Sequence, residues 1–145
     1  MMNADTLEFA FSGICRELAG SKELTFRVLV EGRTGTLHPL IREEVYRIGC
    51  EALLNAARHS DARTIQIEIQ YSSTRLRLVI TDDGDGMTPE SLACKCDRYS
   101  GLSQMRDRAD RIGAKLKLSS RVGAGTEVEL TIPPIDKTFF LGERQ

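Results

Sequence analysis

The sequence has no tryptophan and, in 145 residues, only four prolines, four cysteines and three tyrosines. It also lacks long apolar runs, since no uninterrupted stretch of hydrophobic residues exceeds three. A membrane-spanning helix needs about 20 mostly apolar residues, so we expect none in this chain. The opening MMNADTLEFAFSG has no basic segment followed by an apolar one, which argues against a secretory signal and favours a cytoplasmic location.

An excess of charge of one sign is also missing, because 20 Lys and Arg residues stand against 21 Asp and Glu, for a formal net charge of -1. We therefore expect no broad polyanion-binding surface and no nucleic-acid partner, whereas a local pocket for one phosphate chain is compatible with this balance. The content of 41% hydrophobic residues is typical of one globular domain.

The four cysteines are Cys15, Cys50, Cys94 and Cys96. Their spacing matches neither a zinc site made of two C-x-x-C pairs nor the dense framework of a disulfide-rich secreted domain, so reduced thiols are expected. The alternative for Cys94 and Cys96 is binding of a soft metal or sensitivity to oxidation.

Hydrophobic periodicity predicts three helices and five strands. The helices are expected at about 6–19, 39–60 and 101–112, and the strands at 24–30, 64–71, 76–81, 115–119 and 126–132. A long polar stretch follows the strand at 76–81 and precedes the helix at 101–112, and one short helical turn is expected within it at 88–90. This order predicts an α+β fold, a two-layer sandwich in which helices cover one face of a mixed sheet.

Glu51, Asn55 and His59 recur every four residues on the long predicted helix, which places them on one polar track beside its apolar stripe. Together, a carboxylate, an amide and an imidazole can bind a hydrated Mg²⁺ ion and a phosphate, because carboxylate and amide oxygens suit the metal and the imidazole can donate to an oxyanion. Taken alone, however, this spacing favours the simpler interpretation, a solvated edge of an amphipathic helix.

The run Asp82-Asp83-Gly84-Asp85-Gly86 directly follows a predicted strand. Its glycines allow a sharp turn and a close approach of the backbone to a flat ligand, and an Asp fixed at a strand end can accept a hydrogen bond from an exocyclic amine. A calcium site is disfavoured because the EF-hand spacing is not met. An acidic turn without a ligand is an equal alternative when this motif is considered by itself.

Two further segments contain glycine at the border of a predicted element. Ser100-Gly101-Leu102 begins a helix, whose free N–H groups favour phosphate, and Gly123-Ala124-Gly125-Thr126 is a tight turn that leads into the last strand. Neither segment reads G-x-x-x-x-G-K-[ST] or G-x-G-x-x-G, so P-loop and Rossmann sites are disfavoured.

Taken in order, these motifs resemble the N, G1, G2 and G3 boxes of the Bergerat-fold ATPases, a superfamily that includes gyrase, MutL and the sensor histidine kinases. The four motifs are Glu51-x-x-x-Asn55-x-x-x-His59, Asp82-x-Gly84-x-Gly86, Gly101-Leu102-x-x-Met105-x-Asp107-Arg108-Ala109 and Gly123-x-Gly125-Thr126. The runs YRIGCEALLN at 46–55 and MRDRADRIG at 105–113 look most like the kinases that pair with nitrate-regulator-type response regulators. The resemblance extends from about residue 26 to 133 and implies the Bergerat two-layer sandwich with a mobile ATP lid.

The resemblance implies a role for each motif in binding ATP. Asp82 would bind the adenine amine, and Gly84, Gly86 and Thr126 would complete the adenine pocket.

At the phosphate end, the resemblance implies that Asn55 ligates Mg²⁺, that Glu51 supports the metal or its water, and that His59 faces the phosphates. Glu51 and Asn55 are thus the expected catalytic residues. The other residues expected to contact the triphosphate are Gly101, Leu102 and Arg98.

By the same resemblance, the reaction is transfer of the γ-phosphoryl group of ATP to a histidine on a separate dimerisation domain, followed by relay to a response regulator. Neither His38 nor His59 has the setting of such a phosphoacceptor, so the dimerisation domain is expected elsewhere in a longer parent protein. Attachment of that parent to a membrane is left open. Residues 1–22 are then a leading helix and linker from that upstream region, 23–134 the ATP-binding domain and 135–145 a C-terminal tail.

Two alternatives remain open at this stage. Arg98, Tyr99 and Gln104 depart from the family pattern around the lid, which would suit a degenerate nucleotide-binding scaffold. The length would also suit a binding module that resembles an anti-sigma factor with serine kinase activity, although the Arg-rich run at 105–111 is closer to the histidine kinases.

Overall fold

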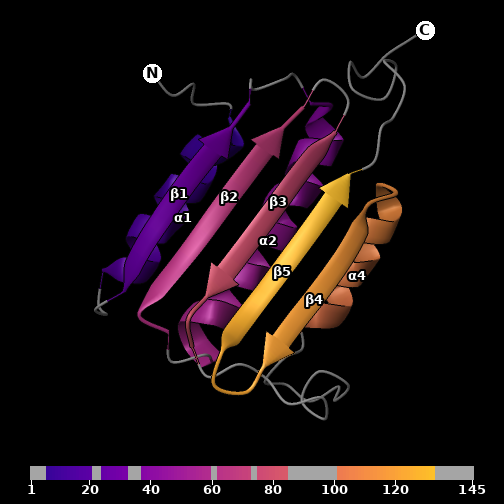
Figure 1. Ribbon diagram of the computed structural model, residues 1–145. Coiled ribbons are helices and arrows are strands. Elements are labelled where there is room, and N and C mark those ends of the chain that lie inside the picture. The colour runs from indigo at the N-terminus through magenta and orange to yellow at the C-terminus, as the bar shows by residue number, and fades with distance from the viewer. Residues whose placement is uncertain are drawn as a thin grey trace, which may run out of the picture.

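The computed structural model describes residues 6–20, 24–32, 37–59, 62–72, 75–84 and 101–132. In this part of the chain, the strands form one mixed sheet in the order β1-β2-β3-β5-β4, and the helices lie together on one of its faces (Figure 1). The elements are α1 (Leu7–Ala19), β1 (Thr25–Glu31), α2 (Pro39–His59), β2 (Thr64–Tyr71), β3 (Leu76–Asp82), α4 (Gly101–Arg111), β4 (Lys115–Arg121) and β5 (Gly125–Ile132). The predicted α+β sandwich is therefore confirmed.

The helix α1 begins at an N-cap and packs against α2. The side chain of Thr6 accepts a hydrogen bond of 3.3 Å from the backbone N–H of Phe9, which satisfies one of the free donors of the first turn. Phe11 is fully buried, and its ring lies so close to Gly49 of α2 that a Cβ at position 49 would overlap it. Since no larger residue fits at position 49, this glycine sets how closely the two helices approach.

The apolar stripe predicted on α2 faces the sheet and the neighbouring helices. Its members are all at most 5% exposed: Ile41, Val45, Ile48, Ala52 and Ala56. Pro39 is the first residue of the helix, where its missing N–H costs no intrahelical hydrogen bond. None of the described helices combines the length and apolar character that crossing a membrane requires.

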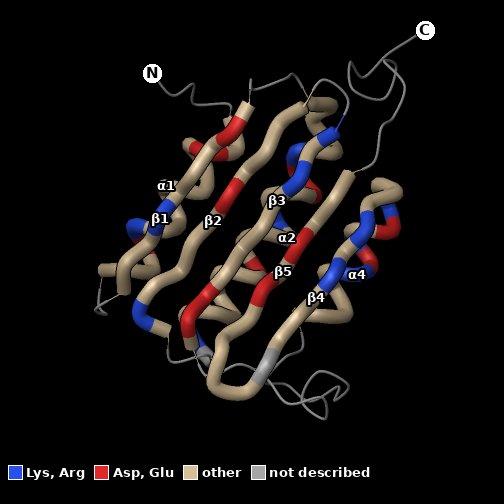
Figure 2. Tube along the Cα trace, in the orientation of Figure 1, with Lys and Arg blue, Asp and Glu red and all other residues tan. Residues whose placement is uncertain are grey.

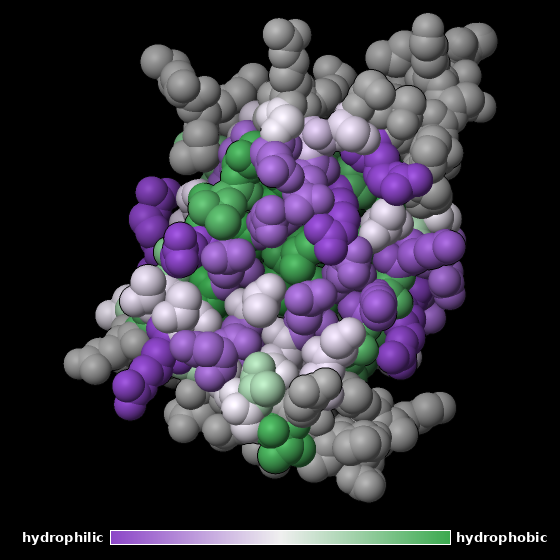
Figure 3. All heavy atoms as spheres, in the orientation of Figure 1, coloured by the Kyte–Doolittle hydropathy of each residue, from purple (hydrophilic) through white to green (hydrophobic). Residues whose placement is uncertain are grey.

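The sheet has one covered and one open face. On β2, Ile65, Ile67 and Ile69 are fully buried under the helices, whereas the intervening residues are only partly buried. The open face is mainly hydrophilic (Figure 3), and acidic and basic residues are interspersed over the molecule instead of forming a field of one sign (Figure 2).

The pairing of the strands brings several distant segments to one end of the sheet. β1 and β2 are parallel, and all other neighbours are antiparallel. As a result, the end of α2, the end of β3, the beginning of α4 and the turn between β4 and β5 lie at the same end of the molecule (Figure 1). These are the four segments that carry the sequence motifs.

Candidate functional site

Asp82, the last residue of β3, is a buried carboxylate that is only 7% exposed. Its Oδ1 accepts a hydrogen bond of 2.9 Å from the backbone N–H of Gly84, which holds the turn that leaves the sheet. A carboxylate can accept several hydrogen bonds, so Asp82 can hold this turn and also accept a hydrogen bond from a ligand.

The neighbouring Asp83 has a different role. It is exposed, and its Oδ1 accepts hydrogen bonds from the backbone N–H groups of Thr64 (3.0 Å) and Arg63 (2.8 Å). These bonds hold the pKa of Asp83 below its ordinary value, because they stabilise the ionised form. Asp83 therefore ties the end of β3 to the beginning of β2, while Asp82 faces the site.

The turn before β5 packs directly against Asp82. Thr126 is the register partner of Asp82 across the β3–β5 pair, and both residues are buried. Gly125 has a φ of +86°, and a Cβ at this position would overlap the carbonyl oxygen of Asp82. Only glycine fits both the left-handed conformation and this close approach.

A pocket of about 250 Å³ opens beside these residues. Its lining residues are Thr81, Asp82, Ser119, Ser120, Ala124, Gly125, Thr126 and Glu127. The pocket is therefore lined both by the predicted residues Asp82 and Thr126 and by two serines at the end of β4, Ser119 and Ser120.

Ser120 is a pocket residue that the sequence analysis missed. Its Oγ donates a hydrogen bond of 3.2 Å to the carbonyl oxygen of Gly125 and lies 2.9 Å from Oγ1 of Thr126. The alternation along β4 contained the signal, because Leu116 and Leu118 pack against the core and Ser120 follows on the same face.

Glu51 and Gly101 meet where α2 passes the beginning of α4. A Cβ at position 101 would overlap the carboxylate of Glu51, so this partly buried side chain lies against the first residue of α4. Asn55 is one turn further along α2 and is also partly buried, while Leu102 points into the core with 6% exposure. His59 is the last residue of α2, and its side chain lies outside the described part of the structure.

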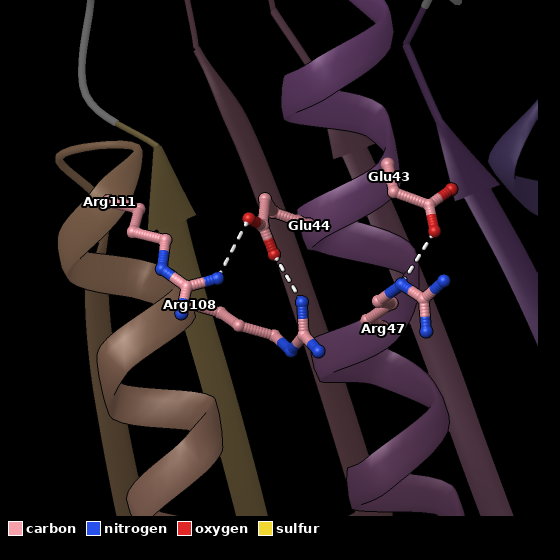
Figure 4. Close-up of polar contacts among 5 residues, drawn as sticks. All are labelled: Glu43, Glu44, Arg47, Arg108 and Arg111. Carbon is pink, nitrogen blue, oxygen red and sulfur yellow. Dashed lines mark hydrogen bonds and ion pairs between the residues drawn. The ribbon is translucent and has the colours of Figure 1, made fainter.

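A group of ion pairs links the last turn of α4 to the first half of α2, at the end of these helices away from the site (Figure 4). Glu44 of α2 accepts a hydrogen bond of 2.7 Å from Nη1 of Arg108 and pairs with Nη1 of Arg111 at 3.4 Å. The hydrogen bond from Arg108 is the main cause that holds the pKa of Glu44 below its ordinary value. Arg108 belongs to the third sequence motif, and the sequence alone indicates no partner for it.

The described residues contain no cluster of three or more His, Cys, Asp or Glu side chains that could hold a metal by themselves. Glu51 and Asn55 could supply two oxygen ligands. Such a small set suits Mg²⁺, which commonly takes one or two protein ligands and completes its octahedron with phosphate oxygens and water.

Several predicted residues fall outside the described ranges. They are Gly86, Arg98, Cys94 and Cys96, together with the short helical turn expected at 88–90.

The two cysteines in the described part of the chain, Cys15 and Cys50, are free thiols. Burial is the main cause that raises the pKa of the Cys15 thiol to about 11.

This mixed sheet with helices on one face is the Bergerat fold, which is found in the ATPase domains of histidine kinases. The pocket lies at the end of the sheet where the four motifs meet. The chain belongs to the family of histidine kinase-, DNA gyrase B- and HSP90-like ATPases, whose pattern it matches over residues 41–136.

Similar curated sequences include two histidine kinases and a sensor protein. The chain is 26% identical over 117 residues to the signal transduction histidine-protein kinase/phosphatase DegS of Bacillus subtilis, covering 81% of this chain and 30% of that protein. It is 33% identical to the sensor histidine kinase LiaS of B. subtilis and 36% identical to the sensor protein VraS of Staphylococcus saprophyticus, each over 93 residues or 64% of this chain. These matches span 25% of LiaS and 26% of VraS, so the chain corresponds to about a quarter to a third of each relative.

Solved structures share the fold. The catalytic domain of histidine kinase ThkA superposes with a TM-score of 0.71 at 17% identity, covering 92% of this chain and 93% of that one. The histidine kinase domain of the blue-light activated kinase EL346 from Erythrobacter litoralis gives 0.69 at 22% identity, covering 88% of this chain and 65% of that one. At these identities the likeness establishes the fold.

Proposed function

We propose that this chain is the ATP-binding catalytic domain of a two-component sensor histidine kinase, which binds ATP with Mg²⁺ and donates the γ-phosphoryl group to a histidine on a separate dimerisation domain. The observation that carries the proposal is the meeting of Asp82 with Gly125 and Thr126, and of Glu51 with Gly101, at one end of the sheet. Family membership and the kinase relatives support it.

At the base end of the proposed site, the carboxylate of Asp82 accepts a hydrogen bond from the adenine amine. Gly84 and Gly86 have no side chain that would hinder a flat base, and Thr126 offers its hydroxyl next to Asp82. The burial of Asp82 and Thr126 supports this role, because a hydrogen bond in a water-poor pocket discriminates better between ligands than an exposed one.

At the phosphate end, Asn55 and Glu51 bind Mg²⁺, which when bound neutralises charge on the phosphates. His59 and Arg98 add donors, and the backbone of Gly101 and Leu102 presents the free N–H groups of a helix N-terminus. Phosphoryl transfer needs mainly positioning and charge neutralisation, so residues that hold the triphosphate are the catalytic machinery here.

We further propose residues 23–134 as the ATP-binding unit and the kinases that pair with nitrate-regulator-type response regulators as its subclass. The runs at 46–55 and 105–113 support this subclass. The partners are then a dimerisation domain of the same kinase and a response regulator, and the activity belongs on the cytoplasmic side, where ATP is supplied.

The test is binding of a non-hydrolysable ATP analogue with Mg²⁺ to the wild type, Asp82→Asn and Asp83→Asn, by calorimetry. Both substitutions remove one negative charge, but only Asp82 borders the pocket. We expect Asp82→Asn to weaken binding at least tenfold, since an amide presents a donor as well as an acceptor to the base amine, and Asp83→Asn to bind like the wild type. Equal affinities in all three proteins would refute the Asp82 assignment.

Transfer of ³²P from ATP to the dimerisation domain of the parent kinase tests the reaction itself. Tight ATP binding without transfer would indicate a degenerate domain. Transfer to a serine of a partner protein would instead favour the anti-sigma-like alternative.

A further inference from the structure

We infer that Ser120 is a positioning residue that sets the base specificity of the pocket. It orients the hydroxyl of Thr126 so that the pocket presents hydrogen-bond acceptors to the base. The pocket thereby selects a purine nucleotide with an amine at position 6 over one with a carbonyl oxygen at that position. The inference rests on the proposed function, because it concerns the base of the nucleotide bound at that site.

The hydroxyl of Ser120 has two oxygen atoms within hydrogen-bond distance, one on Gly125 and one on Thr126. A carbonyl oxygen can only accept, so the 3.2 Å contact between Ser120 Oγ and the oxygen of Gly125 requires Ser120 to donate. The same Oγ lies 2.9 Å from Oγ1 of Thr126, where either hydroxyl could donate if the pair were isolated. With the Ser120 proton directed at Gly125, Thr126 becomes the donor in that contact.

The direction of this bond decides what Thr126 can offer a ligand. A threonine hydroxyl has one proton and two acceptor lone pairs. When its proton points at Ser120, Thr126 presents lone pairs to the pocket. Asp82 lines the same pocket, and its carboxylate is an acceptor as well.

The strand register builds this arrangement into the fold. Ser120 and Thr126 are partners across the β4–β5 pair, and Thr126 and Asp82 are partners across the β3–β5 pair. The three side chains therefore form one row across three strands, and Gly125 next to them is held against Asp82 by the close approach described above.

Two acceptors side by side match a donor amine and repel a carbonyl oxygen. Adenine carries an amine at position 6, whereas hypoxanthine and guanine carry an oxygen there. Thr126 is 8% exposed and Asp82 7%, so water has limited access to relieve a mismatch. A Thr126 hydroxyl that was free to rotate could instead donate to the oxygen and accept the wrong base.

The test compares the dissociation constants of ATP and inosine triphosphate, with Mg²⁺, for wild type, Ser120→Ala and Ser119→Ala. The two bases also differ at N1, so the wild-type ratio is the reference and only its change on substitution is interpreted. We expect Ser120→Ala to lower the ratio of the ITP dissociation constant to the ATP dissociation constant about tenfold. This is the effect of one hydrogen bond, which the freed Thr126 hydroxyl can then donate to the oxygen at position 6 of ITP. Ser119→Ala, a change of the same size at the same pocket, should leave the ratio unchanged.

A second set of variants separates orientation from a general loosening of the turn. Ser120→Thr keeps a hydroxyl and should retain the wild-type ratio. The thiol of Ser120→Cys is a weak donor and acceptor, so this variant should lower the ratio as Ser120→Ala does. If Ser120→Ala does not fold, Ser120→Cys takes its place in the test. In a Thr126→Val background, Ser120→Ala should change the ratio no further, because no hydroxyl is left to orient.

An unchanged ratio in Ser120→Ala or Ser120→Cys, or an equal change in Ser119→Ala, would overturn the inference while leaving the proposed function intact. A further drop of the ratio in the Thr126→Val background would overturn it as well. Failure of the wild type to bind ATP would instead remove the proposed function on which it rests.

Discussion

At the scale of the residue, the contact between Gly101 and Glu51 predicts that Gly101→Ala is destabilising although alanine is the better helix former. The new methyl group would overlap the Glu51 carboxylate, so the free energy of unfolding should fall by about 1–3 kcal/mol. Denaturant unfolding measures this change. Gly13→Ala in α1 is the matched control, because nothing lies within 4 Å of its Cβ position, and it should raise stability by about 0.5–1 kcal/mol.

A double mutant shows whether the overlap is the cause. In a Glu51→Ala background the space at position 101 is open, so adding Gly101→Ala should cost little or nothing. If Gly101→Ala were equally destabilising with and without the Glu51 side chain, the contact would not be the origin of the loss.

The sequence indicated Asp82 and Thr126, which line the pocket, because acidic residues and glycines at the borders of elements are visible in a linear chain; their roles stay predictions. It could not assign separate roles to Asp82 and Asp83, since the hydrogen bonds from residues 63 and 64 that occupy Asp83 arise from strand pairing. Ser120 was missed for a similar reason, because the alternation along β4 gives the face on which it lies but does not give its register partner, Thr126.

At the scale of the element, the Glu44–Arg108 pair predicts a stability loss on acidification. The pKa of Glu44 is lowered in the folded state, chiefly by the hydrogen bond from Arg108, so its contribution is present above the ordinary pKa of 4.5 and is lost as pH falls through the lowered folded value. Wild type should therefore lose stability more steeply below about pH 4.5 than Glu44→Gln does.

The size of the effect should depend on exposure. The side chains of Glu44 and Arg108 are 18% and 29% exposed, so Glu44→Gln at pH 7 should cost up to about 1 kcal/mol. Glu43→Gln is the control, because its pair with Arg47 within α2 is 52% and 56% exposed (Figure 4) and is expected to cost about 0.3–0.5 kcal/mol. Equal losses for the two variants in denaturant unfolding would contradict a specific role of the α2–α4 pair.

The helices and strands lie within one or two residues of their predicted limits, because the apolar periodicity that defines them is local. The stripe on α2 and the alternation on β2 are examples. The strand order and the parallel β1–β2 pair depend on contacts between distant segments, and no local pattern encodes them.

At the scale of the whole molecule, binding of ATP should stabilise the entire domain, because the proposed site joins α2, β3, α4 and the β4–β5 turn. At a concentration 100 times its dissociation constant, Mg-ATP should raise the free energy of unfolding by about 2.7 kcal/mol, which corresponds to a rise of several degrees in Tm. Differential scanning calorimetry measures this shift. Removal of Mg²⁺ with EDTA should abolish most of it. If Asp82→Asn weakens binding tenfold, this variant should keep only about half of the stabilisation, about 1.4 kcal/mol, at the same nucleotide concentration.

The packing of α1 against α2 bears on where this domain can be cut. The family pattern covers residues 41–136, whereas Leu7, Phe11 and Cys15 of α1 belong to the same apolar core as α2 and the sheet. A fragment trimmed to the family pattern would lose both α1 and the edge strand β1 and would expose the surface of α2 at Gly49 that the Phe11 ring covers. The family pattern is thus shorter than the apolar core, and expression of the isolated domain should begin before Thr6.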